Sequence, residues 1–337
     1  MQALSLRILK TALVALSSGI SCCLSAQSLE DLGVAHLVGE AVAQNSARSI
    51  VLSDANLITL GVMDFDPNEF FEFENIDVGN ETSLEQRSQL TTYSLPWHFA
   101  SRPLSNRASS QTQLRLSYIA TEQDLIFEDE TVGNPLEETT FLLYAEHTWR
   151  YQLNQAWHLR TGIGGEILVY DNDLAYRDST LKLFAPYFDN ALFNTSYKVW
   201  TLDPSIGARY QGELMGYRWE YQVAYRYAIG HSFDTDSHLQ DTTVEAGRLS
   251  NSATIHFDTP DVWNRRSQIR LLARRIDLGA DAVPAMGTHH YYELGAGWLI
   301  DTSNDVSFLN NIGIGLSINI DSELSGGSLV ILFNESM

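Results

Sequence analysis

Long runs of alternating side chains are the feature of this chain that most limits its fold. Over residues 214–231, Tyr217, Trp219 and Val223 belong to a series of apolar residues at every second position, with polar or small residues between them. A period of two places successive side chains on opposite faces of a β-strand. The same alternation recurs over 139–152 and is far longer than the usual ~5–6 residues of a strand.

This strand length favours a β-barrel that crosses a membrane. A tilted transmembrane strand needs about 9–11 residues, and its apolar face meets lipid while its polar face lines the interior. A soluble ligand-binding barrel would show the opposite arrangement. The charged residues that lie opposite the bulky apolar ones are therefore candidate pore-lining residues: Arg150, Arg160, Arg218, Glu220, Arg226, Arg270 and Arg274.

The alternation divides the chain into about 12 antiparallel strands. An even number is usual in a single-chain bacterial outer-membrane barrel, because both ends then lie on the periplasmic side. The predicted strands are 56–65, 86–99, 112–121, 139–152, 156–170, 194–210, 214–231, 241–257, 265–278, 288–301, 306–320 and 326–334.

The connections between these strands alternate between long and short. Short periplasmic turns and longer external loops are typical of such barrels. If the first strand runs outward, the external loops are 66–85, 122–138, 171–193, 232–240, 279–287 and 321–325, and the periplasmic ones are 100–111, 153–155, 211–213, 258–264 and 302–305.

The first residues predict export. Arg7 and Lys10 precede the apolar stretch 11–20, which gives way to small residues ending at Ala26. This order is typical of a secretory signal peptide. We therefore assign residues 1–26 to a signal peptide. Both cysteines of the chain lie inside it, so the exported chain offers no thiol for a disulfide, a zinc site or a nucleophile.

Residues 27–48 differ from the rest of the chain. Ser28 and Asp31 resemble a helix-capping pair, and apolar residues then recur at near-helical spacing. We expect one short helix or linker over 27–48, in or near the pore, followed by an outer-membrane barrel domain over 49–337.

Composition excludes two classes of protein. The chain carries 42 Asp and Glu against 21 Lys and Arg, a formal net charge of -21, which repels nucleic-acid phosphates. Its mean hydropathy of -0.14 and its short apolar run exclude a bundle of membrane-spanning helices.

The residue pattern gives no catalytic, cofactor-binding or metal site, so we expect a protein that is not an enzyme and has no cofactor. His231 and Ser232 adjoin two aspartates in an external loop, but neighbours on a strand point to opposite faces. The same geometry separates His289 from His290. The acidic loops lack the spacing of a calcium loop around a central glycine.

The beginning of the barrel resembles a known family. Residues 49–61 read Ser-Ile-Val-Leu-Ser-Asp-Ala-Asn-Leu-Ile-Thr-Leu-Gly, and a helix precedes them. This is similar to the solitary autotransporter-type barrels, which are autotransporter translocator barrels without a long passenger. The resemblance implies a location in the cell outer membrane, contact with its lipid and lipopolysaccharide, insertion by the barrel-assembly machinery and a monomeric state. One departure is that four residues follow Phe333, whereas such barrels usually end on an aromatic residue.

Three functions remain open at this point. The first is a non-enzymatic pore or surface protein whose short helix plugs the barrel. The second is a porin-like channel for small solutes. The third is a surface adhesin or a rim enzyme that uses the long external loops.

Overall fold

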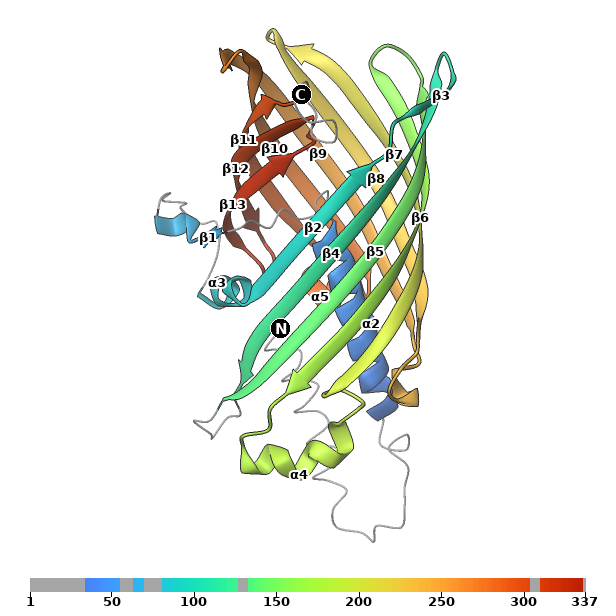
Figure 1. Ribbon diagram of the computed structural model, residues 1–337, viewed down its shortest axis with the longest axis vertical. Coiled ribbons are helices and arrows are strands. Elements are labelled where there is room, and N and C mark those ends of the chain that lie inside the picture. The colour runs from blue at the N-terminus through green and yellow to red at the C-terminus, as the bar shows by residue number, and fades with distance from the viewer. Residues whose placement is uncertain (1–33, 55–62, 70–80, 127–132, 304–309, 336–337) are drawn as a thin grey trace.

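A computed structural model describes residues 34–54, 63–69, 81–126, 133–303 and 310–335. Its strands form one antiparallel sheet that curls into a barrel around a helix (Figure 1). The strands are β1 Met63–Phe65, β2 Leu90–His98, β3 Arg102–Ser105, β4 Ala108–Leu125, β5 Asn134–Gln152, β6 Trp157–Leu174, β7 Thr195–Leu214, β8 Tyr217–Phe233, β9 Thr243–Val262, β10 Arg265–Ala280, β11 His290–Asp301, β12 Asn311–Ile320 and β13 Gly326–Phe333.

The strands follow each other around the barrel in chain order. From β4 to β13, each strand pairs with the next one along the chain. The short strand β1 pairs with β13, and β2 pairs with β4. No pairing joins β2 to β1 or β13 among the described residues, and helix α3 (Glu81–Ser88) contacts all three strands at this seam.

The two faces of the sheet have opposite character. On β5, Phe141 and Leu143 are exposed on the outside, whereas Tyr144 and Glu146 are buried inside. Lipid favours apolar side chains on the outer face, and a polar interior is sustained by hydrogen bonds and ion pairs. Exposed apolar residues continue on the outer face of β4 to β8 and of β10 to β13, as expected for a membrane-spanning wall.

Helix α2 spans Val34–Ser53, α3 Glu81–Ser88, α4 Ser179–Phe188 and α5 Ala282–Met286, with 3-10 turns η2 at Pro67–Glu69 and η3 at His238–Gln240. Helices α2 and α5 lie in the interior, α4 lies at one end, and α3 lies at the side of the barrel against β1, β2 and β13 (Figure 1). Among the described residues, no helix is both long enough and apolar enough to cross a membrane.

The two ends of the barrel differ in their connections. At one end, which we call the turn end, β7 and β8 are joined by Met215 and Gly216, both with positive φ. Trp263 and Asn264 join β9 to β10 in the same way. Two consecutive residues with positive φ match the twist of a tight hairpin. At the opposite end, the loop end, longer connections contain α4, η3 and α5 (Figure 1).

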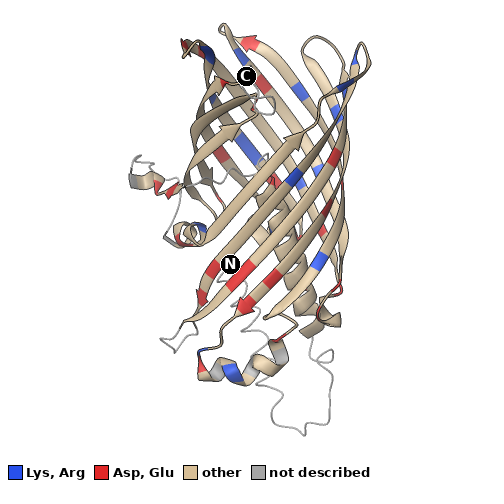
Figure 2. Ribbon diagram, in the orientation of Figure 1, with Lys and Arg blue, Asp and Glu red and all other residues tan. Residues whose placement is uncertain are grey.

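Charged residues are also distributed unevenly along the barrel. Figure 2 shows acidic residues gathered on β4, β5 and β6 near the loop end, with basic residues more frequent in the other half of the barrel. These acids include Glu122, Glu137 and Glu138, which lie in β4 and β5 although the predicted external loop is 122–138.

Most predicted strands are confirmed within a few residues, and four boundaries were wrong. The predicted helix 27–48 continues to Ser53, so the first residues assigned to the barrel domain form its last turn. Inside the barrel, the apolar run at Ile50 is buried on all sides, which suits a helix as well as a strand.

The predicted strand 86–99 begins with the end of α3, and the predicted turn 100–111 contains β3. The predicted periplasmic loop 258–264 is largely strand, because β9 continues to Val262. The predicted signal peptide 1–26 lies outside the described residues, as do residues 27–33, 55–62, 70–80, 127–132, 304–309 and 336–337 of the other predicted segments.

Candidate functional site

Helix α2 is a largely buried helix inside the barrel. Val42, Ala47 and Ile50 pack in one apolar cluster with residues from β4 to β7, β9 and β10. The helix also carries serines, whose hydroxyls donate to carbonyl oxygens of the same helix. Ser46 Oγ lies 2.7 Å from the carbonyl oxygen of Val42, and Ser49 follows the same pattern. These internal bonds let a polar sequence be buried without unsatisfied hydroxyls.

The end of α2 is fixed by charged residues on the barrel wall. Asp54, directly after the helix, is 1% exposed and forms ion pairs of 3.3 Å with Arg115 on β4 and Arg226 on β8. These strands are four apart in the sheet order. The two guanidinium groups also lie at the C-terminus of a helix, where its dipole favours cations.

Hydroxyl groups complete this attachment. Ser94 on β2 donates from its hydroxyl to the carbonyl oxygen of Ser53 at 3.1 Å, and its oxygen lies 2.9 Å from that of Ser117. Arg115 donates to the Ser53 hydroxyl at 3.3 Å. Carbonyls in the last turn of a helix have no partner within the helix. The barrel wall therefore supplies one of the missing partners for this helix end.

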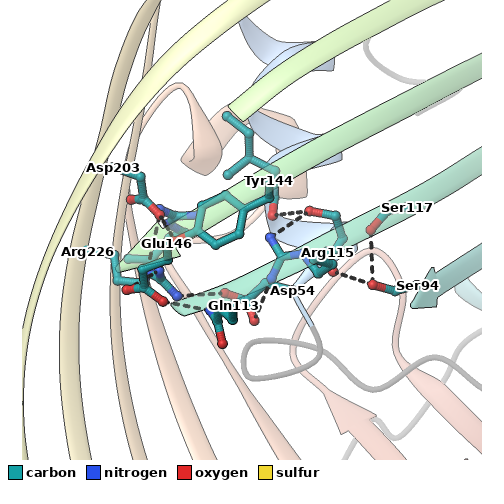
Figure 3. A network of polar contacts seen from close by, with 12 residues as sticks. Asp54, Ser94, Gln113, Arg115, Ser117, Tyr144, Glu146, Asp203 and Arg226 are labelled. Atoms are coloured by element: carbon teal, nitrogen blue, oxygen red, sulfur yellow. Dashed lines mark hydrogen bonds and ion pairs between the residues drawn. The ribbon is translucent and has the colours of Figure 1, made fainter. Parts of the chain in front are cut away.

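A second layer of ion pairs holds Arg226 in place (Figure 3). Its guanidinium lies 2.8 Å from a Glu146 oxygen and 3.2 Å from an Asp203 oxygen. Asp203 also pairs with Arg248 and accepts a hydrogen bond of 3.2 Å from the Tyr144 hydroxyl. The ion pairs of Arg226 thus span β5, β7 and the end of α2.

Acids and arginines of the barrel interior are joined in this network. Its core consists of the acids Asp54, Glu146 and Asp203 and the arginines Arg115, Arg226 and Arg248, and Arg160 also pairs with Glu146 at 3.1 Å. The Arg115 guanidinium stacks 4.5 Å from the centre of the Tyr144 ring. Buried charges are costly unless they are paired, and removing one partner leaves the other uncompensated. Loss of any one member would therefore leave at least one buried charge with fewer partners and destabilise the barrel. We refer to the six charged residues of this core as the anchor network.

A cavity of about 250 Å³ lies beside the anchor network, towards the turn end. Asp54 and Arg226 border it, and the remaining lining comes chiefly from β5 to β9. Its basic lining residues are Arg150, Arg160, Arg209 and Arg226, together with His158.

The loop end is filled by helices and turns. Val34 and Val38 of α2 pack against Ala191 and Leu239, which belong to two different connections at that end. Met286 of α5 joins the main cluster around α2. Leu125, Leu174 and Phe188 form a further apolar cluster there. The described connections therefore cover α2 at the loop end.

The predicted pore-lining residues all lie on the inner face of the sheet, in two groups. Arg150, Arg160 and Arg226 come together at the cavity. The other four lie farther around the wall: Glu220 pairs with Arg209, Arg218 donates to Gln268, Arg270 pairs with Glu335 and Arg274 pairs with Glu293.

Sequence reasoning missed most of the anchor network. Asp54 lay in the quoted stretch 49–61, but its role depends on where the helix ends. Glu146 was visible as an acid at an inward position of a long strand. A buried cation such as Arg226 needs acidic partners. A search for inward-facing acids at the same depth on neighbouring strands would therefore have predicted these residues.

The rim residues considered for catalysis do not form a nucleophile and base pair. The Ser232 hydroxyl donates to the carbonyl oxygens of Gln240 and Thr242, at 2.7 and 3.2 Å. His231 lies 3.3 Å from Asp241 instead. Among the described residues, no three His, Cys, Asp or Glu side chains gather in a way that could hold a metal ion.

Comparison with known proteins decides the family. The model of the "Solitary outer membrane autotransporter beta-barrel domain" family matches residues 43–335. The chain belongs to this family. The match begins within α2 and ends after β13, so it includes the end of the helix, the anchor network and the whole barrel.

Solved structures with a similar fold include two autotransporter domains. The β domain of the Bordetella autotransporter BrkA has 13% identity and a TM-score of 0.43, over 72% of this chain and 88% of that chain. The translocator domain of the autotransporter NalP from Neisseria meningitidis has 11% identity and a TM-score of 0.39, over 71% and 83%. LpxR from Salmonella typhimurium has 11% identity and a TM-score of 0.33, over 71% and 86%. No curated protein sequence matches the chain.

Membership of the family places this solitary autotransporter barrel in the cell outer membrane. In such barrels, short turns face the periplasm and longer loops face the cell exterior. The turn end is therefore the periplasmic end, and the loop end with α4, η3 and α5 is the outer end. Helix α2 runs from the outer end to the middle of the barrel, where Asp54 meets the anchor network.

Proposed function

We propose that this outer-membrane barrel is a non-enzymatic surface protein that its own helix keeps closed. The observation that carries the proposal is the pair of ion pairs from Asp54 to Arg115 and Arg226, which attach the end of α2 to two distant strands. A helix that moved freely would need no such attachment. Because these groups are buried, moving α2 away would expose or unpair charges, which is costly.

Packing at the outer end supports the same proposal. The residues of α2 near that end contact Ala191, Leu239 and α5, which all belong to external connections. Withdrawal of the helix would uncover apolar surface on these connections, and exposing apolar surface to water costs about 25 cal/mol per Å². The closed state is thus stabilised at both ends of the helix by different forces.

We also propose that the external loops are used for display rather than catalysis. The Ser232 hydroxyl is committed to backbone carbonyl oxygens, and His231 is engaged with Asp241. Neither arrangement activates a nucleophile. In this proposal the protein is a monomer, because the anchor network is complete within one chain. Lipid and lipopolysaccharide surround it, and the barrel-assembly machinery inserts it.

A porin-like channel is the second candidate, and one observation favours it. The cavity beside Asp54 provides about 250 Å³ of space lined with four arginines, so the inner half of the barrel is not filled. If α2 were displaced, this space would join a pore with basic walls. The two candidates differ in whether the barrel conducts with α2 in place.

Single-channel conductance in a planar bilayer separates these candidates. The chain lacking residues 1–26 is compared with a chain lacking 1–53 and with the Asp54→Asn variant. We expect the first to stay closed, the deletion to conduct steadily and D54N to open briefly and repeatedly. Glu213→Gln, an exposed acid outside the anchor network, serves as the matched control and should stay closed. Steady conductance of the unaltered chain would refute the plug and favour the channel.

A further inference from the structure

The cavity at the periplasmic side of the anchor network has features that the plug does not require. It exists because inward positions on three neighbouring strands carry small residues, Gly207 on β7, Ala224 on β8 and Ser250 on β9. A side chain at Gly207 would place its Cβ 2.6 Å from the Val223 carbonyl oxygen, so this position is restricted to glycine. The side chains of Arg160 and Arg209 are 34% and 32% exposed, so water reaches their guanidinium groups.

Like charges face each other on the wall of this cavity. Arg150 on β5 and Arg160 on β6 are direct cross-strand partners. Arg209 on β7 is the direct partner of His158 on β6. Like charges directly opposite each other destabilise a sheet. Arg150 and Arg160 therefore face each other at a place where barrel stability alone would favour a neutral side chain on one strand, and Arg209 and His158 lie beside them.

The acids near these arginines are already occupied. Glu146 accepts from Gln113, Arg160 and Ser205 at 2.6, 3.1 and 2.9 Å, in addition to its ion pair with Arg226. A carboxylate has about four lone-pair sites, so this one has no acceptor capacity left. Glu220 pairs with Arg209 and accepts from Gln211.

Donors remain in the cavity after these contacts. The Arg150 side chain donates to the neutral Gln111 oxygen at 2.9 Å, and it forms no ion pair with any of the described residues. Arg209 Nε and His158 Nδ1 are buried and have no hydrogen-bond partner within the part of the chain that the structure describes. Leaving such groups unsatisfied costs free energy, which a bound acceptor would recover.

We propose that this cavity is a binding site for a small phosphate-class oxyanion that enters from the periplasm. Its lining carries four arginines; Arg160, Arg209 and Arg226 each pair with an acid, whereas Arg150 pairs with none of the described residues, so a positive charge is available to an anion. The guanidinium fork matches phosphate geometry, and donors from three strands can surround a tetrahedral anion better than a planar carboxylate. Arg150 supplies the guanidinium without an acid partner, and Arg160, Arg209 and His158 border the same cavity.

The phosphate group could belong to inorganic phosphate or to a soluble phosphate monoester. Bilayer lipid headgroups are excluded from the cavity, because its charged lining residues lie on the inner face of the wall. The site lies on the periplasmic side of the closed helix, so binding does not depend on displacement of α2. Failure of this inference therefore leaves the plug proposal untouched.

Isothermal titration of the refolded chain lacking residues 1–26 with inorganic phosphate tests the proposal. We expect saturable binding of one phosphate per barrel, weakened about tenfold or more in Arg150→Gln, because a hydrogen bond between charged groups is removed. Arg266→Gln is the matched control: Arg266 lies near the same end, pairs with Asp258 at 2.9 Å and lies outside the cavity lining. It should bind phosphate within about twofold of the unaltered chain.

Titrations with other ligands identify the source of the anion, and gel mobility checks that the variants are folded. Glycerol 3-phosphate that binds as tightly as phosphate supports a monoester, and weaker binding supports free phosphate. Acetate should compete poorly. Both variants should keep the heat-dependent gel mobility of a folded barrel. Absence of saturable phosphate binding in the unaltered chain, or equal weakening in R150Q and R266Q, would overturn the proposal.

Discussion

The outer and inner halves of the barrel interior are closed off by different physical means. In the outer half, Val38 and its neighbours on α2 pack against apolar residues of the external connections. In the inner half, Asp54, Arg226 and their partners form a buried set of ion pairs beside a cavity. The outer contacts are numerous and individually weak, whereas the inner ones are few and mutually dependent. Helix α2 is therefore held by apolar packing along its length and by defined ion pairs at its end.

Arg226→Leu should have the largest effect, because it leaves Asp54, Glu146 and Asp203 with fewer cations. Breaking a buried pair by removing one partner costs about 3–5 kcal/mol. We expect this loss in the free energy of unfolding, measured by urea titration in detergent micelles. Arg275→Leu, on an exposed arginine of β10, is the control, and an equal loss there would contradict a special role for the inner half.

Val38→Ala tests the outer half of the comparison. Val38 is fully buried, and the change removes two methyl groups and leaves a space behind. At about 0.8 kcal/mol per buried methylene plus a cavity term, we expect a loss of about 2 kcal/mol in the same urea titration. Ala35→Gly is unsuitable as a control because glycine weakens a helix, so Leu183→Ala on exposed α4 is used instead. A Val38→Ala barrel as stable as the control would show that the outer contacts add nothing.

Asp54→Asn keeps the size of the side chain but removes its charge. Arg226 retains Glu146 and Asp203, and Arg115 loses its ion pair but keeps its hydrogen bond to Ser53 and can donate to the new amide oxygen, so the expected loss is smaller, about 1–2 kcal/mol. The free energy of local opening at the end of α2 should fall by more than the global free energy of unfolding. Hydrogen exchange of α2 amides followed by mass spectrometry should accelerate near Ser53 and stay unchanged near Val38. Uniform acceleration along the helix would mean that the two halves are not independent.

Lys198→Gln should have the smallest effect. Lys198 and Asp234 form an ion pair of 2.5 Å at the outer rim, where their side chains are 40% and 67% exposed. Exposed pairs contribute about 0–1 kcal/mol. We expect unfolding midpoints that barely differ from those of the unaltered chain. A loss comparable to that of Arg226→Leu would show that burial does not explain the difference between the ion pairs.

The strands and their inward arginines could be predicted from the sequence, because alternation reports directly which face each residue occupies. Arg160 and Arg226 are inside for that reason. The partners of Asp54 could not be predicted, since they depend on strands 61 and 172 residues away along the chain, as the separations of Arg115 and Arg226 show. The end of α2 was missed because Ile50 and Val51 are apolar residues typical of strands, and only the enclosing barrel makes a helix favourable there.

Covalent trapping by a disulfide tests whether α2 resides inside the barrel in the outer membrane. A Cβ at Gly39 would lie 3.6 Å from that of Thr242, within the range of a disulfide. Both native cysteines lie in the predicted signal peptide, so Gly39→Cys with Thr242→Cys gives one thiol pair in the chain lacking residues 1–26. Gly39→Cys with Leu214→Cys, at the periplasmic end, is the control pair.

The readout is disulfide formation in the outer membrane under mild oxidation, detected by mass spectrometry of the digested protein. We predict nearly complete bridging of the Gly39 and Thr242 positions and none in the control pair. A barrel that is folded in the membrane but forms no bridge at the first pair would contradict the claim that α2 resides in the barrel.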